Sequence, residues 1–332
     1  MRPLLPPATA AADHPLYGVL LERAAAHSLP RERTDPHRVA LVVEGGGMRG
    51  AVSAGMCLVL DAAGLMASFD RVYGCSSGAL TGCFAAAGQA SVWATSFEDC
   101  ASRAFIDPRR ALRGRPVLDL DFLFENVIAR RRSLSEAGLA AGPDFRAVAV
   151  SATRGELRVL CDFESTADVL AAVRASCSIP VLAGAPPTYR SEPMVDGGLL
   201  EAIPYRTALR EGATHVLVLR SRPAGYHASR EGRLVEPMLA RTHPALVPLL
   251  HSCGERYNGH VSELERLSRR APLLPLVRQI AVPAGSRLVP RLSTDRSRIA
   301  DSVRLGAYTM ASALYGEPAT RFWQPFPELL AA

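Results

Sequence analysis

The chain has 332 residues, of which 48% are hydrophobic and 21% charged, a composition typical of a globular protein large enough for one α/β core. All 38 basic side chains are arginine and the net charge is +6, which favours anionic surfaces such as phospholipid headgroups. No basic run is interleaved with aromatic residues and the seven cysteines contain no C-x-x-C pair, so nucleic acid, a disulfide framework and a zinc site are not expected.

The first 36 residues are rich in proline, alanine and arginine, which predicts an N-terminal arm that wraps the domain and contains one helix over residues 16–26. Prolines interrupt the apolar start after two leucines, so a signal peptide is not expected. No segment of about 18 or more uninterrupted apolar residues is present. We therefore expect a cytoplasmic protein that contacts an anionic membrane surface peripherally, and its oligomeric state stays open.

A glycine-rich turn, residues 44–50, directly follows the apolar run 39–43, which has the length and β-branched content of a buried parallel strand. Gly45, Gly46 and Gly47 leave the backbone uncovered at the start of a predicted helix. Amide groups on such a turn point where an anion or a developing oxyanion would lie. The turn therefore predicts an anion or oxyanion site.

A second turn carries the pattern G-x-S-x-G, from Gly74 to Gly78, after the predicted strand 69–73 and before a small-residue helix over 79–87. Glycines flank the serine because a strand-to-helix turn of this kind is too tight for side chains at those points. The strain of the turn holds the hydroxyl out of the backbone. Ser76 is therefore the predicted nucleophile.

The spacing Gly45-x-Gly47-x-x-Gly50 also fits a dinucleotide-binding fingerprint. Asp61 or Asp70 lies near the distance at which such a site places its ribose-binding acid. The glycine turn alone thus leaves a nucleotide-binding protein as the alternative.

A third motif, Met-Val-Asp-Gly-Gly, occupies residues 194–198 and ends another predicted strand. With the Gly-Gly-Gly-x-Arg-Gly turn and the G-x-S-x-G elbow in the same order, the chain resembles the patatin-like phospholipase family over roughly residues 37–222. Further similarity lies at residues 105–108, 118–121, 175–180 and 202–204.

The resemblance implies that Asp196 acts directly on Ser76 as a base, in a dyad without histidine. An aspartate normally has a pKa near ~4, so it must be close to the hydroxyl, and shielding from water would raise its basicity. Gly197 and Gly198 leave room for that approach.

The oxyanion hole is assigned to the same glycine turn. Its expected donors are the backbone N–H groups of Gly46 and Gly47, with Met48 as a further candidate in the turn that begins at Gly45. Ser77 would contribute as the residue after the nucleophile. Arg49 resembles the family's arginine in this turn, and it either supports the hole or a phosphate, or forms a structural salt bridge.

A Ser-Asp-His triad is the competing arrangement, and it leaves five histidines after the aspartate. His215 begins a predicted strand, whereas the other four lie in the irregular region after residue 222, where a catalytic histidine could sit: His227, His243, His251 and His260. Asp119 and Asp121 could suggest a metal site, although their alternate spacing is more typical of a polar face or a helix cap. No metal or cofactor is expected.

The remaining pattern alternates strands and helices up to residue 222, which predicts a three-layer α/β/α fold with a mostly parallel central sheet. Beyond that point the strand pattern fades, and helices are expected over 258–269 and 294–315. We expect an arm at 1–36, a catalytic domain at 37–222 and a mainly helical extension at 223–332 packed on it.

These observations favour a serine acyl hydrolase of the lipase, phospholipase A or lysophospholipase type, acting on phospholipid or other acyl-ester lipids through an acyl-enzyme. Two alternatives stay open. One is the nucleotide-binding protein described above, and the other is a catalytically silent lipid-binding member of the fold.

Overall fold

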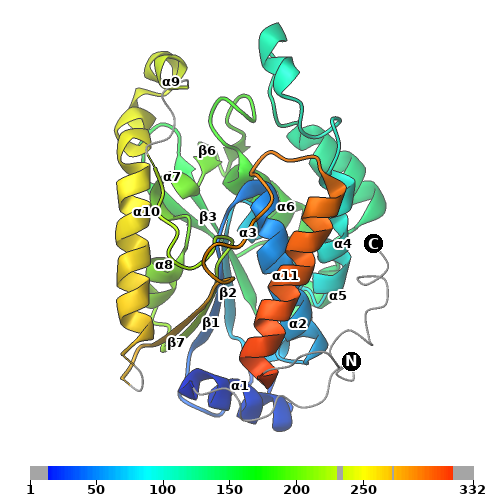
Figure 1. The fold of residues 1–332 in the computed structure, drawn as a ribbon, viewed down its shortest axis with the longest axis vertical. Coiled ribbons are helices and arrows are strands. Elements are labelled where there is room, and N and C mark those ends of the chain that lie inside the picture. Colours follow the sequence, from blue (N-terminus) through cyan, green and yellow to red (C-terminus); the bar gives the residue numbers. More distant parts are fainter. Residues whose placement is uncertain (1–13, 230–234, 271–272, 317–332) are drawn as a thin grey trace.

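Short apolar strands that are buried on both faces form the centre of the fold. The computed structural model describes residues 14–229, 235–270 and 273–316. β1 (Val39–Val43) and β7 (His215–Leu219) are buried at every position and pair in parallel. Such burial requires cover on both faces of the sheet, and Figure 1 shows helices on both sides. The predicted α/β/α class is confirmed.

The sheet has eight strands in the order β5-β6-β3-β2-β1-β7-β8, with β4 paired to β3. From β3 to β8 in this order the strands are parallel, whereas β4, β5 and β6 pair antiparallel at one edge. The parallel strands therefore end at one edge, where the two glycine motifs meet. The other strands are β2 (Arg71–Cys75), β3 (Asp144–Ser151), β4 (Leu157–Leu160), β5 (Thr188–Tyr189), β6 (Glu192–Asp196) and β8 (Leu276–Ile280).

Alternate residues of β1 belong to two different cores. Val39, Leu41 and Val43 pack in the core under one helical layer, and Ala40 and Val42 pack in the other. The first layer contains α2 (Ala51–Ala62), α3 (Ser77–Ala86), α4 (Ala90–Cys100), α6 (Thr166–Cys177) and α11 (Arg296–Tyr315). The second contains α8 (Tyr205–Arg210) and α10 (Val247–Ser268). Shorter helices are α5 (Glu136–Ala141), α7 (Gly198–Glu201) and α9 (Glu236–Thr242).

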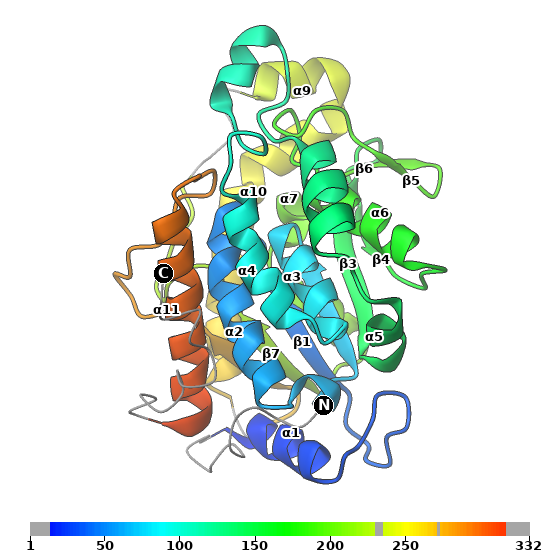
Figure 2. The same cartoon turned by 90° about the vertical axis from the view of Figure 1, so that its right-hand side faces the viewer.

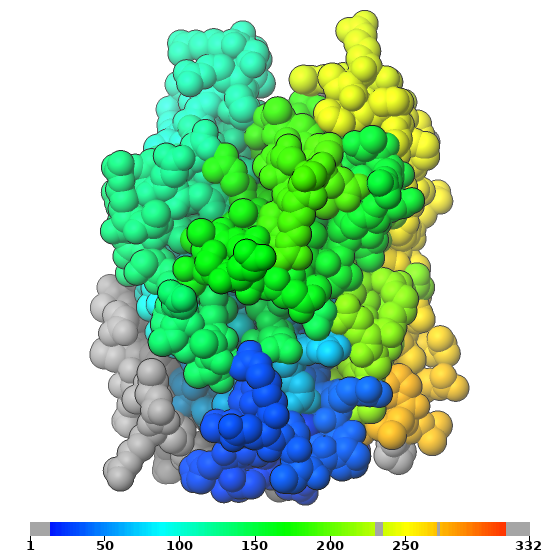
Figure 3. Space-filling model, turned by 180° about the vertical axis from the view of Figure 1, so that it is seen from behind, coloured from blue at the N-terminus to red at the C-terminus, as the bar shows by residue number. Residues whose placement is uncertain are grey.

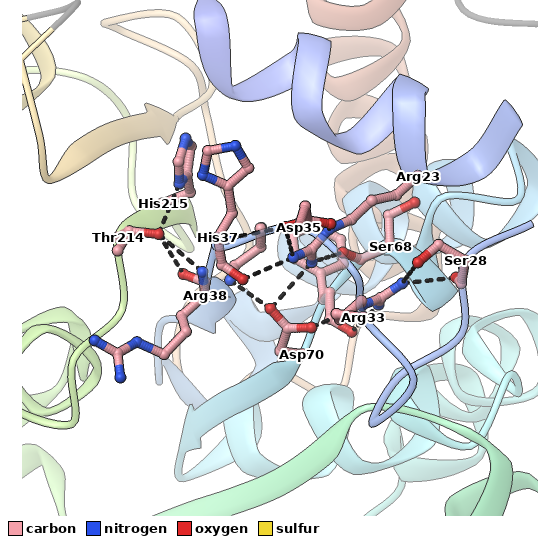
Figure 4. A network of polar contacts seen from close by, with 12 residues as sticks. Arg23, Ser28, Arg33, Asp35, His37, Arg38, Ser68, Asp70, Thr214 and His215 are labelled. Atoms are coloured by element: carbon pink, nitrogen blue, oxygen red, sulfur yellow. Dashed lines mark hydrogen bonds and ion pairs between the residues drawn. The ribbon is translucent and has the colours of Figure 1, made fainter. Parts of the chain in front are cut away.

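The arm is fastened to the amino end of the sheet through α1 (Pro15–Ala25). Figure 4 shows Arg23 between two carboxylates, with Nη2 at 2.8 Å from Asp35 and Nη1 at 3.0 Å from Asp70. Arg33 donates to Asp70 as well, at 2.8 Å. The blue arm lies at one end of the molecule in Figure 3, opposite the teal and yellow segments. The arm's first 13 residues, including the proline-rich start, lie outside the described residues.

The region after residue 222 contains a strand that the sequence does not predict. β8 adds to the sheet beside β7 in parallel. Its pattern is weak because Arg278 and Gln279 interrupt a run of five residues, so its place depends on pairing with β7. α10 begins at Val247 rather than at residue 258, since Pro248 is tolerated in a first helical turn. The proposed boundary at residue 222 stays a prediction.

The predicted helix over 294–315 is α11, and its apolar side faces the core and packs on α2 (Figure 2). The two helices approach closely at two glycines. A Cβ on Gly55 would lie 2.0 Å from the Val303 carbonyl oxygen, and one on Gly306 would lie 1.9 Å from that of Val52. Within the described parts of the chain, no helix has the length and apolar character needed to cross a bilayer.

We predict that Gly306→Ala lowers the free energy of unfolding by about 1–3 kcal/mol or more, because the added methyl group forces α11 away from α2. The measurement is urea unfolding. Gly259→Ala in α10 is the control, since nothing lies within 4 Å of the added Cβ; it should leave stability unchanged or raise it by up to about 1 kcal/mol. Equal midpoints for Gly306→Ala and the wild type would contradict the packing argument.

Candidate active site

Ser76 lies on a strained turn between β2 and α3. Its backbone has φ 54° and ψ −130°, a region that non-glycine residues rarely adopt. The turn is also crowded, because a Cβ on Gly78 would lie 2.3 Å from the Val43 carbonyl oxygen. The strand, sharp turn and helix expected around the predicted nucleophile are therefore all present.

A serine from α6 holds the turn in place. The Ser76 N–H donates to Ser176 Oγ at 2.9 Å, and that hydroxyl donates to the Val148 carbonyl at 2.6 Å. Ser176 thus ties the elbow to the neighbouring strand β3. The sequence gives no local signal for this role, since the contact joins residues 100 positions apart.

Asp196 ends β6 and faces the elbow. Its buried carboxylate lies beside the Ser76 hydroxyl, and Oδ1 accepts the Gly198 N–H at 2.7 Å. Burial raises the pKa of Asp196 above its ordinary value, and the nearby Ser76 hydroxyl and the Gly198 N–H offset part of that rise. A carboxylate with a raised pKa beside a hydroxyl is suited to accept the hydroxyl proton.

The glycine turn lies against the elbow and a distant loop. Gly47 has φ 60°, and a Cβ there would lie 2.7 Å from both Cγ and the carbonyl oxygen of Arg291. Glycine is therefore required by backbone conformation and by space. Arg291 lies far downstream of the motifs, and no pattern in the sequence points to its position beside the turn.

The amides of the turn differ in what they bind. Gly45 donates to the Ala202 carbonyl, Met48 donates to the Arg291 carbonyl and Gly46 donates to Ser77 Oγ, each at 3.0 Å. Of the predicted oxyanion donors, the N–H groups of Gly47 and Ser77 therefore have no acceptor within the described residues. The Gly46 N–H donates to the Ser77 hydroxyl, and that hydroxyl can rotate.

Glu44 anchors the turn in a buried charge network. Its side chain is 0% exposed. It accepts hydrogen bonds from Arg220 Nε at 3.0 Å, Arg222 Nη1 at 2.8 Å, the Tyr257 hydroxyl at 2.7 Å and the Ser221 N–H at 2.7 Å. Burial favours the neutral acid, but the arginines and the hydrogen bonds outweigh it and hold the pKa of Glu44 below its ordinary value.

Arg49 is partly buried beside this network and lies close to Tyr226. No salt bridge of Arg49 occurs within the described residues, so its predicted structural ion pair is not found there. Burial lowers the pKa of Arg49, and the charges of Arg222 and Arg291 lower it further. Three guanidinium groups thus lie within electrostatic reach of one another.

Ser76 and Asp196 open into a cavity of about 520 Å³. A smaller, mainly apolar cavity of about 50 Å³ adjoins Ser76 on the side of α3 and α4. The larger cavity is also lined by Gly45, Gly46, Gly47, Cys75, Ile179, Pro180, Leu182, Gly198, Leu199, Ala202, Arg222, Ala228, Ser229, Val235, Leu239, Leu250, Cys253, Gly254, Tyr257 and Arg291.

The competing triad has no support in this arrangement. All eight histidines fall within the described residues, and none lines the cavity. His215 starts β7 at the amino end of the sheet, where it packs against His37 (Figure 4). His260 packs against Tyr205 on α8. Burial lowers the pKa of both His215 and His260 to about 4.

The acids considered for a ribose or a metal have structural partners. Asp70 accepts hydrogen bonds from Arg23, Arg33 and the Val39 N–H at the amino end of the sheet (Figure 4). Burial raises the pKa of Asp61 to about 6, and the nearby Ala90 N–H offsets part of that rise.

Asp119 Oδ1 accepts the Phe122 N–H at 2.9 Å at the start of a helical turn, as a capping residue would, and Asp121 pairs with Arg174. In the described part of the chain, no group of three potential metal ligands is found.

A family model described as patatin-like phospholipase matches residues 41–209, half of the chain. The chain belongs to the patatin-like phospholipase family. The resemblance drawn from its three motifs is therefore confirmed, and Ser76 and Asp196 both lie inside the matched segment of this patatin-like protein.

The uncharacterized protein YjjU of Escherichia coli (strain K12) is 30% identical over 193 residues, which cover 57% of this chain and 53% of the relative. The chain thus spans about half the length of the curated relative it matches.

Two solved structures are similar at low identity. VipD from Legionella pneumophila is 14% identical with a TM-score of 0.46, covering 84% of this chain and 67% of that one. Human GIVD cytosolic phospholipase A2 in complex with methyl gamma-linolenyl fluorophosphonate is 13% identical with a TM-score of 0.48, covering 97% and 63%. Both TM-scores are below 0.5.

We predict that Glu44→Gln lowers the free energy of unfolding by about 3–5 kcal/mol, because it leaves Arg220 and Arg222 buried without their counter-charge. The stability that the carboxylate contributes is present above the ordinary pKa of 4.5 and is lost as the pH falls through its lower folded-state value. Urea unfolding of Glu44→Gln and wild type is measured between about pH 3 and about pH 7. The difference in unfolding free energy between the two proteins should be largest at the upper end of this range.

The matched control for this prediction is Glu265→Gln, which breaks a pair with the largely exposed Arg269 on α10. It should change stability by less than about 1 kcal/mol. A Glu44 variant as stable as this control would show that the network contributes no net stability.

Proposed function

We propose that this patatin-like protein is a serine acyl hydrolase that cleaves acyl esters of phospholipids or lysophospholipids. The observation that carries the proposal is the position of the Ser76 hydroxyl beside the buried Asp196 carboxylate, on the wall of a cavity large enough for part of a lipid. Family membership supports lipid acyl hydrolysis at the level of reaction class.

In the proposed first half-reaction, Ser76 Oγ attacks the ester carbonyl carbon and its proton passes to Asp196. The N–H groups of Gly47 and Ser77 donate to the oxyanion of the tetrahedral intermediate. When this intermediate collapses, the C–O bond to the alcohol breaks and the alcohol takes the proton from Asp196. An acyl-enzyme on Ser76 remains.

In the second half-reaction, water attacks the acyl carbonyl and gives its proton to the same carboxylate. The second tetrahedral intermediate collapses to release the fatty acid, and the proton returns to Ser76. The raised pKa of Asp196 makes it a stronger base than an exposed aspartate, provided that the pH lies above that pKa.

We further propose that a basic protrusion, residues 103–116, brings the cavity to a lipid surface. Leu112 is 89% exposed at this protrusion, among the exposed side chains of Arg109, Arg113 and Arg115. Figures 1 and 3 show the teal protrusion and α9 at the end of the molecule where the parallel strands finish. An exposed leucine ringed by cations suits an anionic bilayer surface.

The proposed domain limits are 1–36 for the arm, 37–222 for the catalytic domain and 223–332 for the C-terminal extension.

The two alternative functions would require different features of the same site. A nucleotide-binding protein would need an acid facing the glycine turn, whereas Asp61 lies near the Ala90 N–H and Asp70 is bonded elsewhere. A silent lipid-binding protein would bind vesicles without reacting at Ser76.

We predict that Ser76→Ala and Asp196→Asn each reduce hydrolysis of a short chromogenic acyl ester by about 1,000-fold or more, because the nucleophile and its base act as a unit. A fluorophosphonate probe should label the wild type at the peptide containing Ser76 and should not label Ser76→Ala. Circular dichroism and urea unfolding check that both variants fold. Activity of the wild type should fall at acid pH with a midpoint above 3.8, the ordinary pKa of aspartate, because the pKa of Asp196 is raised.

Ser178→Ala serves as a control, since its hydroxyl bonds to the Arg174 carbonyl outside the dyad, and it should keep activity. Full activity in either dyad variant would refute the assigned role. Vesicle binding without any labelling would favour the silent lipid-binding protein.

We predict that Leu112→Asp weakens binding to vesicles that contain phosphatidylglycerol by about tenfold or more, because burial of a leucine side chain is lost and a negative charge is added. Vesicle sedimentation measures the effect, and hydrolysis of a water-soluble ester should be unchanged. Leu29→Asp in the arm is the control, at a leucine that is 51% exposed. Equal vesicle binding by the two variants would show that the protrusion does not contact the membrane surface.

A further inference from the structure

Cys75 precedes the proposed nucleophile in the elbow, and its side chain lies against the proposed base. The residue ends β2 and is 0% exposed. Its Sγ donates to Asp196 Oδ1 at 3.8 Å, and a thiol is a weak hydrogen-bond donor. The elbow therefore contributes a second group, besides the Ser76 hydroxyl, that lies beside the same carboxylate.

One oxygen of the Asp196 carboxylate receives both contacts with measured distances. Oδ1 accepts the Gly198 N–H at 2.7 Å and the Cys75 S–H at 3.8 Å. Each oxygen of a carboxylate offers about two lone pairs, so these two donors occupy Oδ1. They also oppose rotation of the carboxylate about its Cβ–Cγ bond. The second oxygen, Oδ2, is left to accept a proton.

The surroundings of Cys75 leave its side chain little room to move. Its backbone pairs with Val148 of β3, and a Cβ on Gly45 would lie 2.7 Å from its carbonyl oxygen. A Cβ on Gly197 would lie 3.1 Å from Sγ. Because glycine at residue 197 has no side chain, the thiol can lie directly against the Asp-Gly-Gly motif.

The thiol acts as a donor because it stays protonated. Burial raises the pKa of Cys75 well above its ordinary value, and the charge of Asp196 raises it further. The contact acts in the other direction on the base. Burial raises the pKa of Asp196, and the Cys75 S–H is one of the groups that offset this rise. A donor of this kind favours the ionised carboxylate.

We propose that Cys75 is a positioning residue whose thiol holds the Asp196 carboxylate in its working orientation. Oδ2 is then the oxygen that faces Ser76 and takes its proton. This inference rests on the proposed hydrolase function. It gives the residue before the nucleophile, which the pattern G-x-S-x-G leaves unspecified, a part in preparing the base.

The test compares Cys75→Ala with wild type in the hydrolysis of a short chromogenic ester over a range of pH. Loss of the donor disfavours the ionised carboxylate, so the midpoint of the fall in activity at acid pH should rise by about 0.3 unit or more. At the pH optimum, kcat should fall by about threefold or more with KM unchanged, because the base is held less well. Circular dichroism and urea unfolding check the fold.

Two further variants separate the hydrogen bond from packing. Cys75→Ser has nearly the volume of the alanine variant but keeps a donor, so its acid midpoint should lie closer to that of wild type. Cys83→Ala removes a thiol that is also 0% exposed and that donates to the Leu80 carbonyl at 3.2 Å, so it should leave the midpoint unchanged. If Cys75→Ala folds but keeps the wild-type midpoint, the thiol only fills space and the positioning role is overturned.

Infrared spectroscopy provides a readout that does not depend on turnover. The S–H stretching band that disappears in Cys75→Ala belongs to this thiol. It should move to higher frequency in Asp196→Asn, because an amide oxygen is a weaker acceptor than a carboxylate. If wild type hydrolyses no ester but the band moves, the hydrolase proposal fails while the contact between thiol and carboxylate stands. A band that stays in place in Asp196→Asn would overturn the contact.

Discussion

The buried carboxylate of Glu44 is the constraint on which the rest of the site depends. A charge with no exposed surface is tolerated only where opposite charges and hydrogen bonds surround it. Its partners come from the end of β7 and from α10, at separations of 176 and 213 residues. Because the glycine turn follows Glu44 directly, the same contacts place the turn against the elbow. The position of the proposed oxyanion donors is thus a consequence of charge pairing behind them.

The amino end of the sheet holds the arm, and the carboxyl end holds the proposed active site. At the amino end, Asp70 joins Arg23 and Arg33 and fastens the arm, and His37 and His215 pack together there. At the carboxyl end lie the two strained turns and the cavity. Parallel strands bring these turns to one edge because each strand must end on the same side of the sheet. The proposed chemistry therefore lies at the end of the sheet opposite the described part of the arm.

Much of the centre of the fold follows from local patterns in the sequence. The predicted strand over 39–43 matches the observed bounds, the elbow lies between a strand and a helix as predicted, and the Asp-Gly-Gly motif lies at the end of a strand as predicted. These signals are local because a buried strand needs an apolar run and a tight turn needs glycine. The glycine turn, the elbow and the Asp-Gly-Gly motif also follow one another in the order typical of the family.

What could not be predicted depends on contacts between distant residues. β8 has a weak pattern of its own and is stabilised by pairing with β7. The amide of Met48 was a candidate oxyanion donor, yet it is bonded to a carbonyl more than 200 positions away. Glu44 had no assigned role because the need for a counter-charge becomes visible only when Arg220 and Arg222 are placed beside it.

The carbonyl of Arg291 has a consequence for how the protein is made. Ribosomes synthesise a chain from its amino end, so the hydroxyl and the carboxylate of the dyad leave the exit tunnel well before the loop that caps the glycine turn. A nascent chain therefore holds the proposed dyad without the last support of that turn. We expect the glycine turn to reach its final conformation only once the loop that carries Arg291 has been synthesised and has folded against it.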